Sequence, residues 1–192
     1  LIPILILTNI SFTTEKDNDI PKLDNPFSVS YLKENLTQSK PRMIYNDKII
    51  KGLKTKIKTD PVISNLYEAI RIDAYEILNL PVIKRIKETN AMLDVSRELL
   101  RRINMLGLVY LVEEDKVMLD RINQEIMAVS NFSDWNPPVY LDVAEICMAV
   151  ALALDWTQDN LPAPTIKMAK KALIEKGIYP SWEEHGGNIR HA

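Results

Sequence analysis

The stretch Asn131–Trp156, NFSDWNPPVYLDVAEICMAVALALDW, decides the fold class of this chain. It opens as a loop that holds an aromatic side chain, an amide and two prolines, and it continues as a helix. The apolar run Ile146–Leu154 leaves that helix no polar face, and a helix that is apolar all round is buried on every side. The run is too short to span a bilayer. The stretch therefore predicts a buried central helix in an all-α protein.

Helical periodicity recurs on both sides of this stretch. Ile49, Leu53 and Ile57 follow one another at intervals of four residues, which places them on one helix face. The pair Asp60-Pro61 then supplies an N-cap and a proline for the first turn of the next helix. The same pattern along the chain predicts six helices, over 46–59, 61–79, 94–112, 116–130, 140–156 and 165–176.

Short connections join most of these helices, and only 80–93 is expected to be a longer, basic and irregular one. Asp94 is the expected N-cap after it, and Gly177 suits the C′ position of the last helix. Six helices joined in this way pair as three αα-hairpins. We therefore expect an all-α domain over residues 41–178, arranged as a partial α/α toroid built from αα-hairpins.

The two ends of the chain lack helical periodicity. Residues 1–40 are interpreted as the remnant of a signal peptide, LIPILIL at Leu1–Leu7, followed by an extended arm, and the stretch Glu15–Pro41 holds three prolines. The alternative for Leu1–Leu7 is a buried strand or a segment docked on the body. The first interpretation predicts a periplasmic or secreted protein. Residues 179–192 are expected to form an irregular tail.

Composition excludes several classes of protein. A net charge of −2 and a pI near 5.8 give no support for nucleic-acid binding, which usually needs a basic patch. The single cysteine, Cys147, cannot form an internal disulfide, and its place in the apolar run favours a small buried side chain over a nucleophile. No metal-binding or cofactor-binding motif occurs, so neither a metal nor a cofactor is expected.

Several polar residues are candidates for chemistry, each with a structural alternative. Asp142 and Glu145 share one face of a first helical turn and would suit an acid and a base, although acidic residues there also cap free N–H groups. Arg97, Arg101 and Arg102 would suit an anionic substrate, although such arginines more often pair with neighbouring carboxylates. The last candidates would suit bases or ligands, but they lack metal-site spacing and cluster in the tail that is expected to be irregular: His185, Asn188, Arg190 and His191.

The loop before the central helix holds the best candidates for substrate binding. Trp135 would stack on a sugar ring, and Asn136 would hydrogen-bond its hydroxyl groups. The alternative is that Trp135 plugs the edge of the core while Asn136 forms a local turn. Sequence alone leaves both open.

Three blocks in this order resemble the N-terminal helical domain of the heparinase II/III-like polysaccharide lyases, a family that includes alginate lyases. They are PRMIYNDKIIKGLKTKIKTDPVISNLYEAI (Pro41–Ile70), DVSRELLRRINMLGLVYLV (Asp94–Val112) and FSDWNPPVYLDVAEICMAVALALDW (Phe132–Trp156), and ALIEKGI (Ala172–Ile178) follows them. The block DWNP…LDVAE is the most specific. The resemblance implies an incomplete α/α toroid, followed in full-length family members by a C-terminal β-sandwich domain.

The resemblance also implies a function. Family members are exported and cleave acidic polysaccharides by β-elimination, in which a base removes the proton α to the uronate carboxylate and a Tyr acts on the glycosidic oxygen. The catalytic Asn, His and Tyr of family chains come after the LDVAE helix, so no catalytic residue is carried over to this chain. Only Asp134, Trp135 and Asn136 match positions that border the substrate cleft.

We therefore expect a fragment of a lyase that acts on a uronate-containing polysaccharide of the heparin, heparan sulfate or alginate type, inactive by itself. Its expected partner is the acidic polysaccharide, with no nucleic acid and no membrane span. One alternative is a non-catalytic helical module that binds glycan or protein. Another is an α/α-toroid glycoside hydrolase that uses Asp142 and Glu145.

Overall fold

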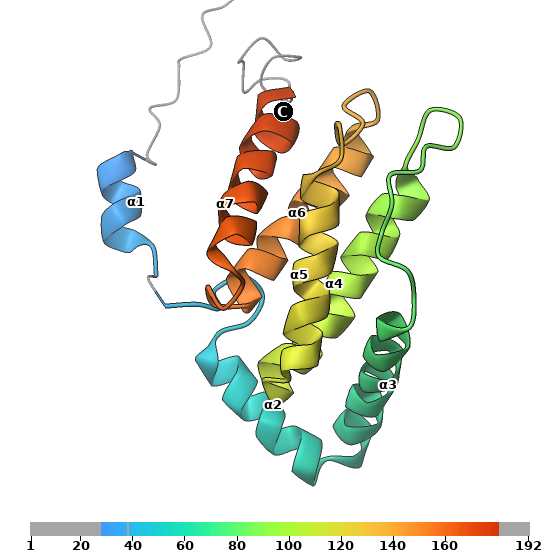
Figure 1. Cartoon of the computed structure of the whole chain (residues 1–192). Helices are drawn as coiled ribbons and strands as arrows, with labels where there is room; N and C mark the ends of the chain where they lie inside the picture. Colours follow the sequence, from blue (N-terminus) through green and yellow to red (C-terminus); the bar gives the residue numbers. More distant parts are fainter. Residues whose placement is uncertain (1–27, 38, 181–192) are drawn as a thin grey trace, which may run out of the picture. The chain divides into compact units, whose positions relative to one another are not determined.

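The computed structural model describes residues 28–37 and 39–180, and every named element in these ranges is a helix, which confirms the predicted all-α class (Figure 1). The only β pairing among them is an isolated bridge between Glu88 and Ala91. The elements are α1 (Val29–Asn35), α2 (Asp47–Thr59), α3 (Pro61–Leu78), α4 (Leu93–Glu113), α5 (Lys116–Ser130), α6 (Tyr140–Trp156), α7 (Ala163–Ala172) and the π-helical turn η1 (Leu173–Ile178).

The chain divides into two compact units, Leu1–Leu36 and Thr37–Ala192. In the first unit, the structure corrects the prediction of an extended arm, because α1 is a helix. The Ser28 Oγ caps it by accepting a hydrogen bond from the Tyr31 N–H, and none of its residues is buried. A helix of seven residues is too short to give a sustained periodic signal in the sequence. The predicted signal-peptide remnant, Leu1–Leu7, lies outside the described residues.

Helices α2 and α3 begin where the sequence predicts. Asn46 Oδ1 accepts a hydrogen bond from the Ile49 N–H at 3.0 Å, and Asp60 Oδ1 accepts one from the Val62 N–H at 2.9 Å. The connection before α4 is irregular, as expected, but Asp94 is not the N-cap. Helix α4 begins one residue earlier, and Asp94 lies in its first turn, where a carboxylate interacts favourably with the helix dipole.

The second unit packs its helices in two layers. Helix α4 packs most extensively against α6, and α5 packs against α7, so that α5 and α7 lie in front of α4 and α6 in Figure 1. Helices α4 and α6 approach closely because Gly107 has no side chain. A Cβ built there would lie 2.5 Å from Cε3 of Trp156, so any other residue would push the two helices apart.

Helix α6 is buried on most of its surface but not on all of it. Ile146, Val150 and Leu152 are buried as predicted, whereas Met148 is 46% exposed and Leu141 is 48% exposed. The prediction that the apolar run is buried on every side is therefore wrong for one strip of the helix. Its neighbours α4, α5, α7 and η1 cover the other sides, and no described element covers this strip. No described helix is both long and apolar enough to cross a membrane.

The last helix differs from the prediction at both ends. It begins at Ala163, before the predicted 165, and it widens into η1 at Leu173. Gly177 is not a C′ residue but a buried position inside η1, where a Cβ would lie 2.5 Å from Cys147 Sγ. Burial raises the pKa of Cys147 to about 11, which fits the predicted packing role. Residues 181–192 lie outside the described ranges, and with them His185, Asn188, Arg190 and His191.

Candidate functional site

The loop before α6 holds the three residues predicted to bind substrate, and the structure uses two of them as internal contacts. Trp135 is fully buried, and its Nε1 donates a hydrogen bond to the Val129 carbonyl oxygen at 3.0 Å. Its ring also lies against Gly177, since a Cβ there would be 3.4 Å from the indole Cζ3. No face of Trp135 is open to a sugar in this arrangement. The ring fills the edge of the core, which is the alternative to sugar binding that the sequence left open.

Asn136 is also buried and adopts a left-handed conformation with φ of 61°. Its Nδ2 donates hydrogen bonds to the Asn90 carbonyl oxygen at 2.8 Å and to Asp142 Oδ2 at 2.7 Å. Asparagine tolerates this backbone region better than most residues. Asn136 therefore joins the connection 80–93 to the start of α6 and has no amide proton left for a substrate.

Asp134 is the one member of this set with an exposed carboxylate, and it is paired with Arg85. Arg85 Nη2 contacts both carboxylate oxygens, at 2.8 and 2.9 Å. Burial opposes ionisation of Asp134, but the hydrogen bonds from Arg85 and from the Asn136 N–H outweigh burial and lower the pKa of Asp134. Asp134 is therefore ionised and paired with Arg85. Together with its hydrogen bond from the Asn136 N–H, this pair fixes the conformation of the loop.

The proposed acid and base, Asp142 and Glu145, both lie against Ser96 of α4. Asp142 is fully buried and accepts hydrogen bonds from the Met92 N–H at 2.8 Å and from Asn136. Glu145 accepts a hydrogen bond from Ser96 Oγ at 2.5 Å and pairs with Arg97 at 3.4 Å. A buried carboxylate with its acceptor sites filled holds the start of α6 in place. Acid–base chemistry at Asp142, as in the glycoside hydrolase alternative, has no access to substrate here.

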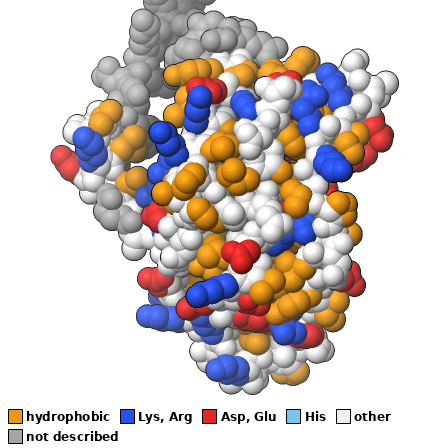
Figure 2. All heavy atoms as spheres, in the orientation of Figure 1, with side chains coloured by type: hydrophobic (Ala, Val, Ile, Leu, Met, Phe, Trp, Pro, Cys, Tyr) orange, Lys and Arg blue, Asp and Glu red, His pale blue; other side chains and the backbone are white. Residues whose placement is uncertain are grey.

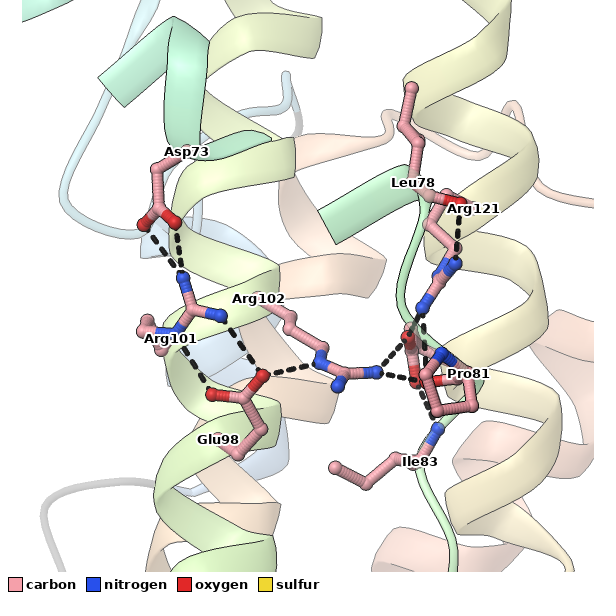
Figure 3. Close-up of polar contacts among 9 residues, drawn as sticks. Asp73, Leu78, Pro81, Ile83, Glu98, Arg101, Arg102 and Arg121 are labelled. Atoms are coloured by element: carbon pink, nitrogen blue, oxygen red, sulfur yellow. Dashed lines mark hydrogen bonds and ion pairs between the residues drawn. The ribbon is translucent and has the colours of Figure 1, made fainter. Parts of the chain in front are cut away.

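Two of the three candidate arginines, Arg101 and Arg102, belong to a partly buried network of ion pairs rather than to a substrate site (Figure 3). Arg101 contacts both oxygens of Asp73, at 2.6 and 2.7 Å, and also pairs with Glu98. Arg102 lies between Glu98 and Glu125, at 2.7 and 2.8 Å. These contacts tie α3, α4 and α5 together.

Glu125 is the centre of that network and is fully buried. Its Oε1 accepts hydrogen bonds from Arg102 Nη1 and Arg121 Nε, both at 2.8 Å, and its Oε2 accepts one from the Ile83 N–H at 2.9 Å. A cavity of about 260 Å³ lies beside it, bounded by Val82, Val95 and the connection around Ile83. Where Glu98 and Arg102 line this cavity, they are paired with each other and Arg102 is also paired with Glu125, so the network is structural.

A surface with unpaired charges occurs on α2 instead. Lys48, Lys51, Lys54 and Lys58 follow one another at spacings of 3, 3 and 4, so that they form one strip along this helix. We call these four residues the α2 lysine strip. In Figure 2, blue side chains are visible among red ones at the lower end of the molecule, where α2 lies in Figure 1.

Only one member of the α2 lysine strip has an ion-pair partner among the described residues. Lys54 pairs with Glu114 at 3.3 Å, whereas Lys48, Lys51 and Lys58 are exposed and make no such contact within residues 28–37 and 39–180. The opposite face of α2 carries Ile50, Leu53 and Ile57 and packs on the rest of the unit. The strip thus presents a row of free cations on a helix that is fixed by its apolar face.

The net charge of the whole chain, −2, gives no sign of this strip. The acidic residues that cancel the charge lie elsewhere, and α2 holds a single one, Asp47. The spacing of the lysines was visible in the sequence and would have identified the strip. No described group of three or more His, Cys, Asp or Glu side chains is arranged to hold a metal ion.

No protein-family model matches the sequence, and a search of curated proteins finds no match either.

Proposed function

We propose that this chain is the helical part of a polysaccharide lyase for a uronate-containing substrate, and that it binds the acidic polymer without cleaving it. The observation that carries the proposal is the α2 lysine strip, because a row of unpaired cations suits a polymer with repeated carboxylate or sulfate groups. The resemblance of Pro41–Ile70, Asp94–Val112 and Phe132–Trp156 to heparinase II/III-like lyases supports the same substrate class.

The two layers of helices also support this assignment. Consecutive helices contact each other, and helices of different hairpins lie side by side within a layer, as α4 and α6 do. We propose that this arrangement is part of an α/α toroid. We also propose that the protein is exported, because the apolar run Leu1–Leu7 resembles the remnant of a signal peptide.

The α2 lysine strip provides the test of the substrate class. Replacing Lys48, Lys51 and Lys58 together by glutamine is expected to weaken the binding of heparin or alginate by roughly tenfold, because each exposed ion pair contributes about 0.2–1 kcal/mol. The effect should shrink as salt is added, since the Debye length falls to about 8 Å at 0.15 M ionic strength. Isothermal titration calorimetry at two salt concentrations measures both effects.

The matched control is a triple glutamine variant of α7 at Lys167, Lys170 and Lys171, which are also exposed lysines on a helix. It removes the same charge and is expected to keep its affinity within about twofold of the original chain. An equal loss of affinity in both variants would show a general effect of charge. Tighter binding of duplex DNA than of either polysaccharide would assign the strip to nucleic acid.

We expect no lyase turnover by the isolated chain. β-Elimination needs a base beside the α-carbon and donors on the carboxylate at the same time, and a displacement of about 1 Å can lower the rate by about 10²-fold. Asp142 and Glu145, the acid and base of the glycoside hydrolase alternative, do not supply such a base either, because Ser96 and other fold contacts hold them. The assay follows the ultraviolet absorbance of the unsaturated product with heparin, heparan sulfate and alginate. Sustained product formation that is lost in His185→Ala or His191→Ala would refute this expectation.

A further inference from the structure

A polar cavity of about 480 Å³ lies where the turn between α4 and α5 meets the loop after α6. The volume is typical of a site for a small ligand. Polar side chains from three places in the sequence border it: Tyr110 and Glu114, then Lys116, then Gln158 and Asn160. Leu111 and Leu119 supply apolar surface. The cavity thus combines hydrogen-bonding groups with a small apolar wall.

Several of these polar groups have hydrogen-bonding capacity left. Tyr110 Oη accepts a hydrogen bond from Asn160 Nδ2 at 2.9 Å, which leaves the phenolic proton free to be donated. Within the described part of the chain, neither the Lys116 ammonium nor the Gln158 amide has a side-chain partner. The Glu114 carboxylate is paired with Lys54, so Lys116 carries the unpaired charge of the lining, which suits a ligand with negatively charged oxygen atoms.

The position of Lys116 also favours an anion. It is the first residue of α5, where the helix dipole opposes a cation and attracts an anion. Two neighbours in the lining, Glu114 and Gln158, have positive φ values of 58° and 51°, in a region that costs non-glycine residues energy. An anion between Lys116 and Tyr110 would offset the unfavourable placement of the lysine.

We propose that this cavity binds a single uronate unit of the acidic polysaccharide. Lys116 and the Tyr110 O–H hold the carboxylate, while the Gln158 and Asn160 amides bind the ring hydroxyl groups. The C–H face of the sugar lies against Leu111 and Leu119. This inference rests on the proposed function and adds the site that recognises the sugar.

The ion pair between Lys54 and Glu114 places the cavity beside the α2 lysine strip. Glu114 borders the cavity, and its partner Lys54 belongs to the strip, with 3.3 Å between the two charged groups. A polymer that lies along α2 therefore reaches the cavity without leaving the protein surface. The strip attracts the polyanion, and the cavity selects a carboxylate-bearing ring.

The test is a titration of the full chain with glucuronate, followed by amide chemical shifts in two-dimensional NMR. Glucose is the matched ligand control, because it differs at the carboxylate position only. We expect saturable shifts around Lys116 and Gln158 with glucuronate and at least tenfold weaker binding of glucose, since hydrogen bonds to charged groups contribute about 1.5–3 kcal/mol. Lys116→Gln should weaken glucuronate binding about tenfold, and Tyr110→Phe several-fold.

The control variant is Lys167→Gln, which removes an exposed lysine from α7 and should bind glucuronate like the original chain. Unchanged binding in Lys116→Gln, or shifts confined to other residues, would overturn the cavity proposal. If glucuronate does not bind while heparin still binds through the α2 lysine strip, the cavity proposal fails and the proposed function stands. If neither binds, both fail.

Discussion

Replacing Trp135 by alanine is expected to lower the free energy of unfolding by about 3–5 kcal/mol. The indole is fully buried, contacts the η1 turn at Gly177 and donates its N–H to the Val129 carbonyl oxygen. The variant leaves a cavity where α5, α6 and η1 meet, and it leaves that carbonyl without its donor. Urea unfolding followed by far-ultraviolet circular dichroism measures the loss.

The control for this experiment is Tyr179→Ala, because Tyr179 is an aromatic residue that is 54% exposed. Its loss should change the free energy of unfolding by about 0.5 kcal/mol or less, the usual range for surface substitutions. A change below 1 kcal/mol in Trp135→Ala would contradict the burial of the ring. Such a result would mean that the indole ring is accessible and that Trp135 is again a candidate for sugar binding.

Glu125→Gln is expected to be the second strongly destabilising substitution, by about 3–5 kcal/mol. The new side chain has nearly the same shape, but it removes the charge that Arg102 and Arg121 share in the interior. Its amide also cannot accept hydrogen bonds at both positions, so either an arginine or the Ile83 N–H loses its acceptor. Arg121 is then buried without a carboxylate, and Arg102 keeps only Glu98, which accounts for the size of the effect.

The matched control is Glu175→Gln, which breaks an ion pair with the same spacing of four residues on a helix surface. Glu175 and Lys171 are 3.8 Å apart, and both are about half exposed or more. The free energy of unfolding should change by about 0.5 kcal/mol or less. Urea midpoints for the two variants compare a buried pair with an exposed one. Equal midpoints would show that the network around Glu125 contributes little.

The helices of the second unit were predictable because their signals are local. Asn46 and Asp60 cap α2 and α3 through contacts within three residues, and the apolar spacing between caps needs no tertiary information. The helix ends that the sequence predicts wrongly depend instead on residues that are distant in the sequence. Helix α4 starts early at a backbone N–H held by Asp142, 50 residues away in sequence, and η1 widens where Gly177 meets Cys147.

The candidate site was less predictable, because exposure depends on which elements cover a side chain. Trp135 and Asn136 have the residue types of a sugar-binding loop, yet their partners Val129, Asn90 and Asp142 turn them inward. Met148 shows the opposite case, an apolar residue that no described helix covers. The cavity joins Tyr110 to Asn160, which is 50 residues away in sequence, so no local pattern would have identified it.

The central claim is that the α2 surface holds an acidic, uronate-containing polysaccharide. The most direct measurement is a map of amide chemical shifts on the original chain during titration with a short alginate oligomer. The account predicts shifts along Lys48–Lys58 that continue into Glu114 and Lys116, with little change around Asp134. Shifts centred on the loop at Asp134, or no shifts at an oligomer concentration that saturates a millimolar site, would contradict it.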